Sequence, residues 1–226
     1  MTGSKGDDRK QEFLETALEL FYEKGYEKTT IKDIIGRMGV SKGAFYHYFE
    51  SKEDVIITIA KDYADKAINL IEKIAKRKDI DAIEKLNLVI ESVNQYKSTK
   101  EDERSKIKNV FLDEENLKLQ RKITNELKKD SVRLFKEIID EGVEDGIFET
   151  TNSSELAEYL LHTINHMNSS IDELLLDAQE KNINTTELSK KLEDKLSFYE
   201  EMLSKILRIK KGSIELKEPY MKRFLN

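Results

Sequence analysis

The sequence predicts an all-α fold, and three observations support this class. The chain of 226 residues contains one proline and nine glycines, and neither residue type occurs between Ala44 and Glu141. An all-β chain needs turn residues at short intervals, so this stretch favours helices joined by short polar turns. Apolar residues also recur at helical spacing along the chain, and charged residues make up 37% of it, as is typical of charge-rich helical proteins.

The individual helices are expected from apolar periodicity and from capping residues. Thr30 precedes the second helix and Asp33 follows three residues later, which is a variant of the capping box. Ser41 and Ser51 stand in the same capping position before the third and fourth helices. Residues 212–226 show no clear periodicity and are expected to form a tail or a short strap. The expected helices span residues 8–24, 30–38, 42–49, 52–74, 80–97, 103–111, 114–141, 153–178 and 186–210.

The composition excludes several classes of protein. The chain has no cysteine, so disulfides, thiolate metal sites and thiol redox chemistry are excluded. The longest apolar runs, such as residues 55–60, are far too short to span a membrane. The first ten residues lack the apolar segment of a secretion signal. We therefore expect a cytoplasmic protein with no membrane partner and no cofactor.

The net charge of −6 is unevenly distributed along the chain. Basic and acidic residues are equal in number over residues 1–52, so the negative charge lies from Glu53 onward. Over residues 36–52 the basic residues outnumber the acidic ones. The net charge therefore does not exclude binding of nucleic acid by the N-terminal segment, nor does it argue for it.

The third expected helix has two different faces. At roughly 100° per residue, Ala44, Phe45, Tyr48 and Phe49 fall on one side. These residues are expected to pack against the neighbouring helices, because so short a helix is not stable alone. The other side offers a phenol and an imidazole for phosphates and a lysine for phosphate or guanine. A polar outer face without a specific function is the simpler interpretation. This second side consists of Lys42, Gly43, Tyr46 and His47.

Two stretches of the sequence carry a recognisable motif. The first is G-Y-E-K-T-T-I-K-D-I at residues 25–34, and the second is G-V-S-K-G-A-F-Y-H-Y-F at residues 39–49, followed by S-K-E at 51–53. Together they resemble the N-terminal pattern of the tetracycline-repressor (TetR) family of transcriptional regulators. Elsewhere the chain is similar to that family only in length, helical content and scarcity of proline. The matching residues are Phe21, Gly25, Tyr26, Thr29, Thr30, Tyr46, Tyr48, Phe49 and Lys52.

The resemblance implies a helix-turn-helix DNA-binding domain over residues 1–52 and an effector-binding and dimerisation domain over residues 53–226. It implies a homodimer that binds double-stranded DNA at a palindromic operator, with the third helix in the major groove. An unidentified small-molecule effector would release the DNA, and no enzymatic activity is expected. By the same resemblance, Thr30, Tyr46, His47 and Lys52 contact phosphates, whereas Ser41, Lys42, Gly43 and Ala44 lie nearest the bases.

Candidates for the effector pocket are polar or aromatic residues on otherwise apolar helices, although such residues more often belong to a core or an interface. His162 and His166 are four residues apart, a helical spacing that can hold a divalent metal. No third ligand or H-E-x-x-H motif accompanies them, so no metal site is expected, and a role at an interface is favoured. The candidates are Tyr96, Asn109, Phe111, Phe135, His162, Asn165 and His166.

Two long apolar stripes near the C-terminal end are expected to mediate dimerisation. The resemblance implies that the last two long helices form a four-helix interface with a second copy. A role in the core of the monomer stays open for part of each stripe. The first stripe consists of Leu156, Leu160, Ile164, Met167, Ile171, Leu174 and Ala178, and the second of Leu188, Leu192, Leu196, Tyr199, Leu203, Ile206 and Leu207.

Two alternatives to a ligand-responsive repressor are open at this point. A hydrolase would use His162, His166 and nearby carboxylates, but the sequence has no nucleophile elbow, glycine-rich phosphate loop or metal triad. A constitutive DNA-binding or adaptor protein would keep the helix-turn-helix unit without a small-molecule effector. Ligand-dependent release from DNA distinguishes the repressor from this second alternative.

Overall fold

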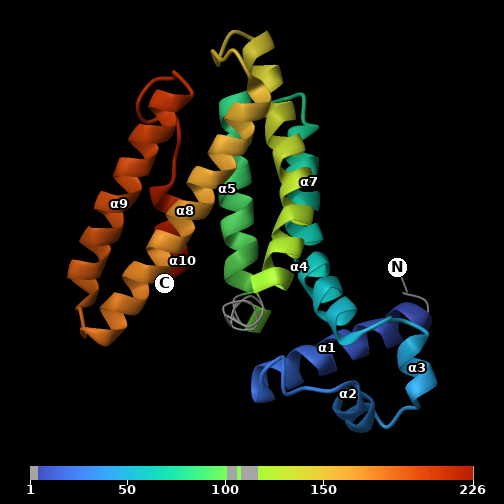
Figure 1. Cartoon of the computed structure of the whole chain (residues 1–226). Coiled ribbons are helices and arrows are strands. Elements are labelled where there is room, and N and C mark those ends of the chain that lie inside the picture. The colour runs from blue at the N-terminus through green and yellow to red at the C-terminus, as the bar shows by residue number, and fades with distance from the viewer. Residues whose placement is uncertain (1–4, 101–105, 108–116, 226) are drawn as a thin grey trace. The chain divides into compact units, whose positions relative to one another are not determined.

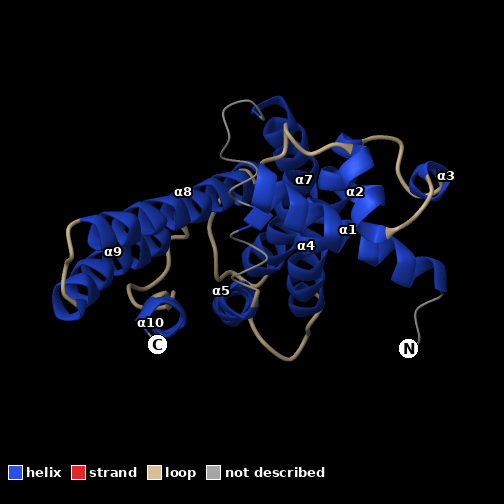
Figure 2. Cartoon of the chain, turned by 90° about the horizontal axis from the view of Figure 1, so that it is seen from below, coloured by secondary structure: helices blue, strands red, loops and turns tan. Residues whose placement is uncertain are grey.

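The structure is a computed structural model, and it describes residues 5–100, 106–107 and 117–225. In this part of the chain all regular secondary structure is helical and no strand occurs (Figure 2). The prediction of an all-α fold is therefore confirmed. The helices labelled in Figure 1 are α1 (Lys5–Lys24), α2 (Ile31–Met38), α3 (Lys42–Tyr46), α4 (Lys52–Ala75), α5 (Ala82–Thr99), α7 (Leu117–Glu144), α8 (Ser153–Glu180), α9 (Thr185–Ile206) and α10 (Lys217–Leu225).

The chain folds into two compact units. Unit 1 lies within residues 1–66 and 100–128, and unit 2 within residues 67–99 and 129–226. Both α4 and α7 begin in unit 1 and end in unit 2. The domain boundary expected after residue 52 stays a prediction.

The core of unit 1 is built around aromatic rings from α1 and from the segment around α3. Phe13 is fully buried and packs edge-on against Phe45 and Phe49, with ring centroids 5.8 and 6.0 Å apart. The start of α4 adds Val55 and Ile56, which are also fully buried. Because α3 has only five residues, these ring contacts supply the stability that so short a helix lacks by itself.

The expected caps of the helices in unit 1 are present. The Thr30 hydroxyl accepts a hydrogen bond from the backbone N–H of Asp33 (3.2 Å), while the Asp33 carboxylate accepts from the N–H of Thr30 (2.9 Å), which completes a capping box. Gly39 ends α2 in the left-handed conformation (φ 65°), as predicted for this glycine. The hydroxyls of Ser41 and Ser51 accept from backbone N–H groups 3.3 and 3.0 Å away.

The third helix is shorter than expected. It ends at Tyr46, with His47 as its C-cap, and a turn at residues 47–48 follows it before α4 begins. The expectation of a helix over 42–49 was drawn from the alternation of aromatic and polar residues, which continues into this turn. The burial pattern is nevertheless as predicted, because Phe45 and Phe49 are buried and Tyr46 and His47 are exposed.

The C-terminal segment of unit 2 forms a helix, α10, which the sequence does not predict. It packs against α5 and α9 (Figure 1), and Tyr220 and the preceding Leu216 are almost fully buried. The Glu200 carboxylate on α9 accepts hydrogen bonds from the N–H groups of Leu216 (2.9 Å) and Lys217 (3.2 Å). Contacts with distant residues therefore hold this short helix in place, rather than a local periodic pattern.

Most residues of the two expected dimerisation stripes lie in the core of unit 2. Leu160, Met167 and Ile171 on α8, and Leu192 and Leu196 on α9, are at most 2% exposed. The two helices pack against each other and turn these side chains inward. These residues therefore have the core role that was left open, and an interface with a second copy would use other faces of α8 and α9.

Among the described residues no helix is long and apolar enough to cross a membrane.

Candidate nucleic-acid interface

The exposed face of α3 carries the groups that the sequence assigns to DNA. Lys42, Gly43, Tyr46 and His47 are exposed, and Tyr46 is 48% exposed whereas the neighbouring Phe45 is fully buried. The Lys42 ammonium lies 5.6 Å from the centroid of the Tyr46 ring, within range of a cation–π contact. Because the opposite face is anchored in the aromatic core, this face has a fixed orientation.

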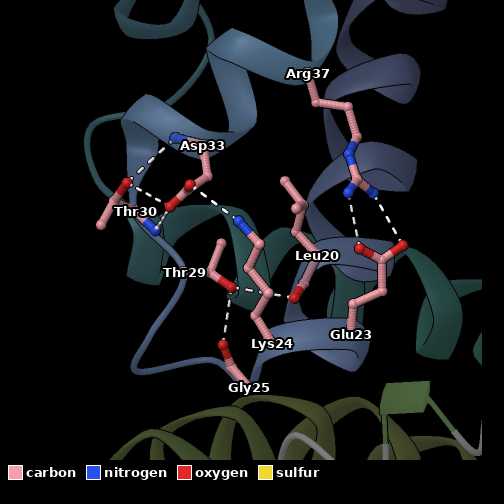
Figure 3. Close-up of polar contacts among 8 residues, drawn as sticks. All are labelled: Leu20, Glu23, Lys24, Gly25, Thr29, Thr30, Asp33 and Arg37. Atoms are coloured by element: carbon pink, nitrogen blue, oxygen red, sulfur yellow. Dashed lines mark hydrogen bonds and ion pairs between the residues drawn. The ribbon is translucent and has the colours of Figure 1, made fainter.

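The N-terminal side of the site is the junction between α1 and α2, which Figure 3 shows in detail. Arg37 on α2 donates two hydrogen bonds to the two carboxylate oxygens of Glu23 on α1, at 3.0 and 2.8 Å. This hydrogen bonding lowers the pKa of Glu23. Lys24 on α1 donates to the Asp33 carboxylate at 3.1 Å. These pairs are exposed and contribute little to stability individually, but together they fix how α2 lies on α1.

Thr29 and Thr30 have different roles although they are adjacent. Thr29 is 1% exposed, and its hydroxyl lies 2.8 Å from the Gly25 carbonyl and 3.1 Å from the Leu20 carbonyl, to which it donates. It therefore satisfies backbone acceptors at the end of α1. The Thr30 hydroxyl donates to the Asp33 carboxylate (2.6 Å), and this bond is the largest reason why the pKa of Asp33 is lowered. Both hydroxyl protons are thus used within the chain (Figure 3).

Lys52, at the start of α4, is directed into unit 1. Its ammonium donates to the backbone carbonyls of Tyr26 (2.7 Å) and Glu27 (3.3 Å) and lies 4.1 Å from the centroid of the Tyr26 ring. Burial lowers the pKa of Lys52, because it disfavours the charged ammonium. Burial also raises the pKa of Tyr26 to about 12, because it disfavours the charged phenolate. A phosphate would have to compete with these internal partners of Thr30 and Lys52. The phosphate contacts expected of the two residues stay predictions.

The remaining DNA candidates lie together at the N-terminal end of α3. Ser41 is exposed and caps the helix, and Ala44 is half-buried at the edge of the exposed face. A side chain at position 43 would meet no clash within the protein, because the atom nearest to an added Cβ is the Ser41 hydroxyl oxygen at 3.8 Å. The structure thus brings Ser41, Lys42, Gly43 and Ala44 to one end of the helix, as a reading role would require.

The effector candidates do not gather in one place. Phe135 is buried in the core of unit 2, and Tyr96 is half-buried on α5. His162, Asn165 and His166 are exposed on α8, and the His162 Nε2 atom lies 3.6 Å from the Glu158 carboxylate. Two further candidates fall outside the described residues. These are Asn109 and Phe111.

A cavity of about 570 Å³ lies in unit 2 between α5 and α10. Its lining includes Asn87, Glu91 and Asn94 of α5 and Glu218 and Lys222 of α10. None of the described effector candidates lines it. Sequence reasoning missed this cavity because α10 was not predicted. The described residues contain no group of three or more histidines or carboxylates that could hold a metal ion.

Comparison with known proteins identifies the family. The family model of bacterial regulatory proteins of the tetR family matches residues 13–59, and the model of the C-terminal region of YsiA-like proteins matches residues 63–168. The fatty acid metabolism regulator protein of Bacillus subtilis is 31% identical over 135 residues, which cover 60% of this chain and 68% of that protein. The chain belongs to the TetR family.

Two further regulators show how far the similarity extends along the chain. The uncharacterized regulator YuxN of Bacillus subtilis is 39% identical over 72 residues, so the match spans only 25% of that protein and 32% of this chain. The crystal structure of FadR from Bacillus subtilis in complex with stearoyl-CoA has a similar fold, with a TM-score of 0.60 and 23% identity. That match covers 91% of this chain and 99% of FadR.

As a TetR-family protein, the chain is a transcriptional regulator whose DNA-binding element is the helix-turn-helix of α2 and α3. Both helices lie within the matched residues 13–59, as do all the residues of the motif.

Proposed function

We propose that the protein is a ligand-responsive repressor that binds a palindromic operator as a homodimer. The exposed face of α3, fixed by the buried Phe45 and Phe49, is the observation that carries this proposal. Residues 41–44 lie nearest the bases, and Tyr46 and His47 contact phosphates. Phosphate contacts fix the register of the protein on DNA, and contacts to base edges supply the sequence preference.

The homodimer that we propose uses the outer faces of α8 and α9. Tyr159 and Leu176 on α8 are 53% and 58% exposed, and Phe198 on α9 is 60% exposed. Large apolar side chains in contact with water are unfavourable, and a group of them supports a protein interface. The exposed His162 and His166 lie on α8, as do Tyr159 and Leu176. Two-fold pairing would place the operator half-sites roughly 34–36 Å apart, or a multiple of that distance.

For the effector we propose a fatty acyl thioester. The 31% identical relative is named as a regulator of fatty acid metabolism, and the FadR structure of similar fold holds stearoyl-CoA. A constitutive DNA-binding or adaptor protein is the second candidate, because the described effector candidates do not converge on one cavity.

Titration of the protein against its own upstream DNA tests the proposal. A random-sequence duplex of equal length is the control for specificity, and coenzyme A without an acyl chain is the control for the ligand. We expect preference for the upstream fragment and release of it by stearoyl-CoA. Equal binding of both duplexes would refute the specific repressor, and preference without any ligand response would favour the constitutive protein. Sedimentation of wild type and of Phe198→Glu tests the dimer, which the substitution should dissociate.

A further inference from the structure

Apart from Lys42, which belongs to the exposed face of α3 described above, the cations of the helix-turn-helix region, residues 24–52, fall into two groups. In the first group the ammonium or guanidinium is hydrogen-bonded within the chain. Lys24 pairs with Asp33 (3.1 Å) and Arg37 with Glu23 (2.8 Å), while the Lys52 ammonium has two carbonyl acceptors. Arg37 and Lys52, two of the three cations in residues 36–52, are therefore held by partners within unit 1. The carbonyl acceptors of Lys52 are neutral and leave its charge in place, but they hold its ammonium at the 26–27 turn.

The second group is exposed and has no such partner. Lys28 lies in the turn between α1 and α2, and Lys32 lies in the first turn of α2. Both side chains are exposed, and neither has a hydrogen bond or an ion pair with any residue that the structure describes. Neither lysine is among the residues that match the family's motif, so the motif does not draw attention to them.

The position of Lys32 on α2 separates it from the junction with α1. At roughly 100° per residue, Lys32 lies about 100–140° around the helix from Asp33 and Arg37, which pair with α1. The apolar face of α2, with Ile34 at its centre, is buried. Lys32 therefore leaves α2 on the exposed flank that does not pack on α1. A lysine in the first turn also opposes the helix dipole, so it does not serve to stabilise α2.

We propose that Lys28 and Lys32 contact DNA phosphates beside the α2–α3 element, and that Lys52 instead holds the 26–27 turn against the start of α4. This inference rests on the DNA binding of the family and on no assumption about operator or effector. It replaces a phosphate contact at a motif lysine by two contacts at lysines outside the matching residues of the motif. Phosphates are the ligand chemistry, because lysine is a flexible point charge suited to the DNA backbone.

The test measures how binding to a random-sequence duplex depends on salt. Each phosphate contact adds roughly 0.9 to the slope of log K against log [salt]. We expect Lys28→Gln and Lys32→Gln each to reduce this slope by about 1 and to weaken binding several-fold at low salt. Their thermal midpoints should match that of wild type, because both side chains are exposed and unpaired.

Arg37→Gln and Lys52→Gln are the matched controls, since each removes one cation from the same region. We expect them to keep the wild-type slope, and Lys52→Gln to lower the thermal midpoint because two carbonyl contacts are lost. Lys52→Arg, which keeps the charge, covers the case in which Lys52→Gln does not fold. An unchanged slope for both Lys28→Gln and Lys32→Gln would overturn the proposal, as would a reduced slope for Lys52→Gln. Neither result depends on operator preference or ligand response, so the repressor proposal stands or fails separately.

Discussion

Lys85 and Glu141 form an ion pair inside unit 2, and the lysine side chain is fully buried. The Lys85 ammonium also donates to the Ala75 carbonyl (3.1 Å), the last residue of α4. The Glu141 carboxylate on α7 also forms an ion pair with the exposed Lys78, at 2.9 Å. One buried ammonium thus connects the end of α4 with α5 and α7. A charge in this position is tolerated only while both of its acceptors are present.

Removal of the Glu141 carboxylate should therefore destabilise the folded protein. We expect Glu141→Gln to lower the free energy of unfolding by about 3 kcal/mol, because the buried Lys85 loses its counter-charge. Lys78→Ala removes the exposed partner of the same carboxylate and should change the free energy of unfolding by less than about 1 kcal/mol. Urea denaturation of the variants at neutral pH measures both effects. Equal losses would show that Lys85 is not the partner that matters.

The same pair predicts how stability depends on acid. The hydrogen bond from Lys85 holds the pKa of Glu141 below its usual range. A lowered pKa contributes stability that is present above the unfolded pKa of about 4.3 and is lost as the pH falls through the folded pKa. The difference between wild type and Glu141→Gln should therefore shrink when denaturation is repeated at progressively lower pH.

Gly142 should not tolerate a side chain. A Cβ atom at this position would lie 2.3 Å from the Phe148 ring and 2.9 Å from the Ala82 side chain. We expect Gly142→Ala to destabilise the protein by about 1–3 kcal/mol through overpacking. Gly36→Ala is the control, because an added Cβ meets nothing within 4 Å there and alanine is the better helix former by about 1 kcal/mol. Thermal midpoints should move in opposite directions for the two variants.

The sequence was sufficient to predict those parts of the fold that depend on neighbouring residues. Thr30, Gly39 and Ser41 define the ends of α2 and α3 through local capping chemistry, and the structure contains each cap. In contrast, α10 depends on hydrogen bonds from residues 52 and 16 positions away, such as those of Tyr220 with Asn168 and of Leu216 with Glu200. Such pairs leave no periodic pattern in the sequence.

Periodicity also could not decide what covers an apolar face. The stripe with Leu160 and Met167 has the spacing expected of an interface, but it packs into the core of the same chain. In the helix-turn-helix, residue type alone could not tell a paired cation such as Arg37 from an unpaired one such as Lys32, because the partner of Arg37 lies 14 residues away on α1.

Alkaline conditions should weaken unit 2 through Tyr220. Burial raises the pKa of Tyr220 to about 12, and its hydroxyl donates to the Asn168 side chain at 2.9 Å. Because the folded state favours the protonated phenol, the contribution of Tyr220 to stability is fully present below its unfolded pKa of about 10. This contribution is lost as the pH rises toward 12. Tyr220→Phe should lower the free energy of unfolding by about 1 kcal/mol at neutral pH. Between roughly pH 10 and 12 the variant should lose less stability than wild type, which denaturation at several pH values measures. A parallel decline of both proteins would assign the alkaline loss to another group.

Tyr46 should affect affinity without affecting sequence preference. Its hydroxyl is exposed on α3, where a phosphate contact is proposed, and phosphate contacts carry no base information. We expect Tyr46→Phe to weaken binding to the upstream fragment and to a random duplex by the same factor, because the ring that stacks with Lys42 is kept. Competition between the two duplexes measures the ratio. A change in that ratio would show that Tyr46 reads a base.

The late position of α10 in the chain has a consequence for biosynthesis. The residues of unit 1 lie within 1–66 and 100–128, so a ribosome delivers all of them before residues 213–220. The polar side chains of Asn87, Asn168 and Glu200 reach their partners only when this segment emerges. Because domains fold as units during synthesis, a nascent chain that stops before α10 would hold a DNA-binding element joined to an unfinished unit 2. Such truncated chains should be substrates for quality-control proteases before they can compete for an operator.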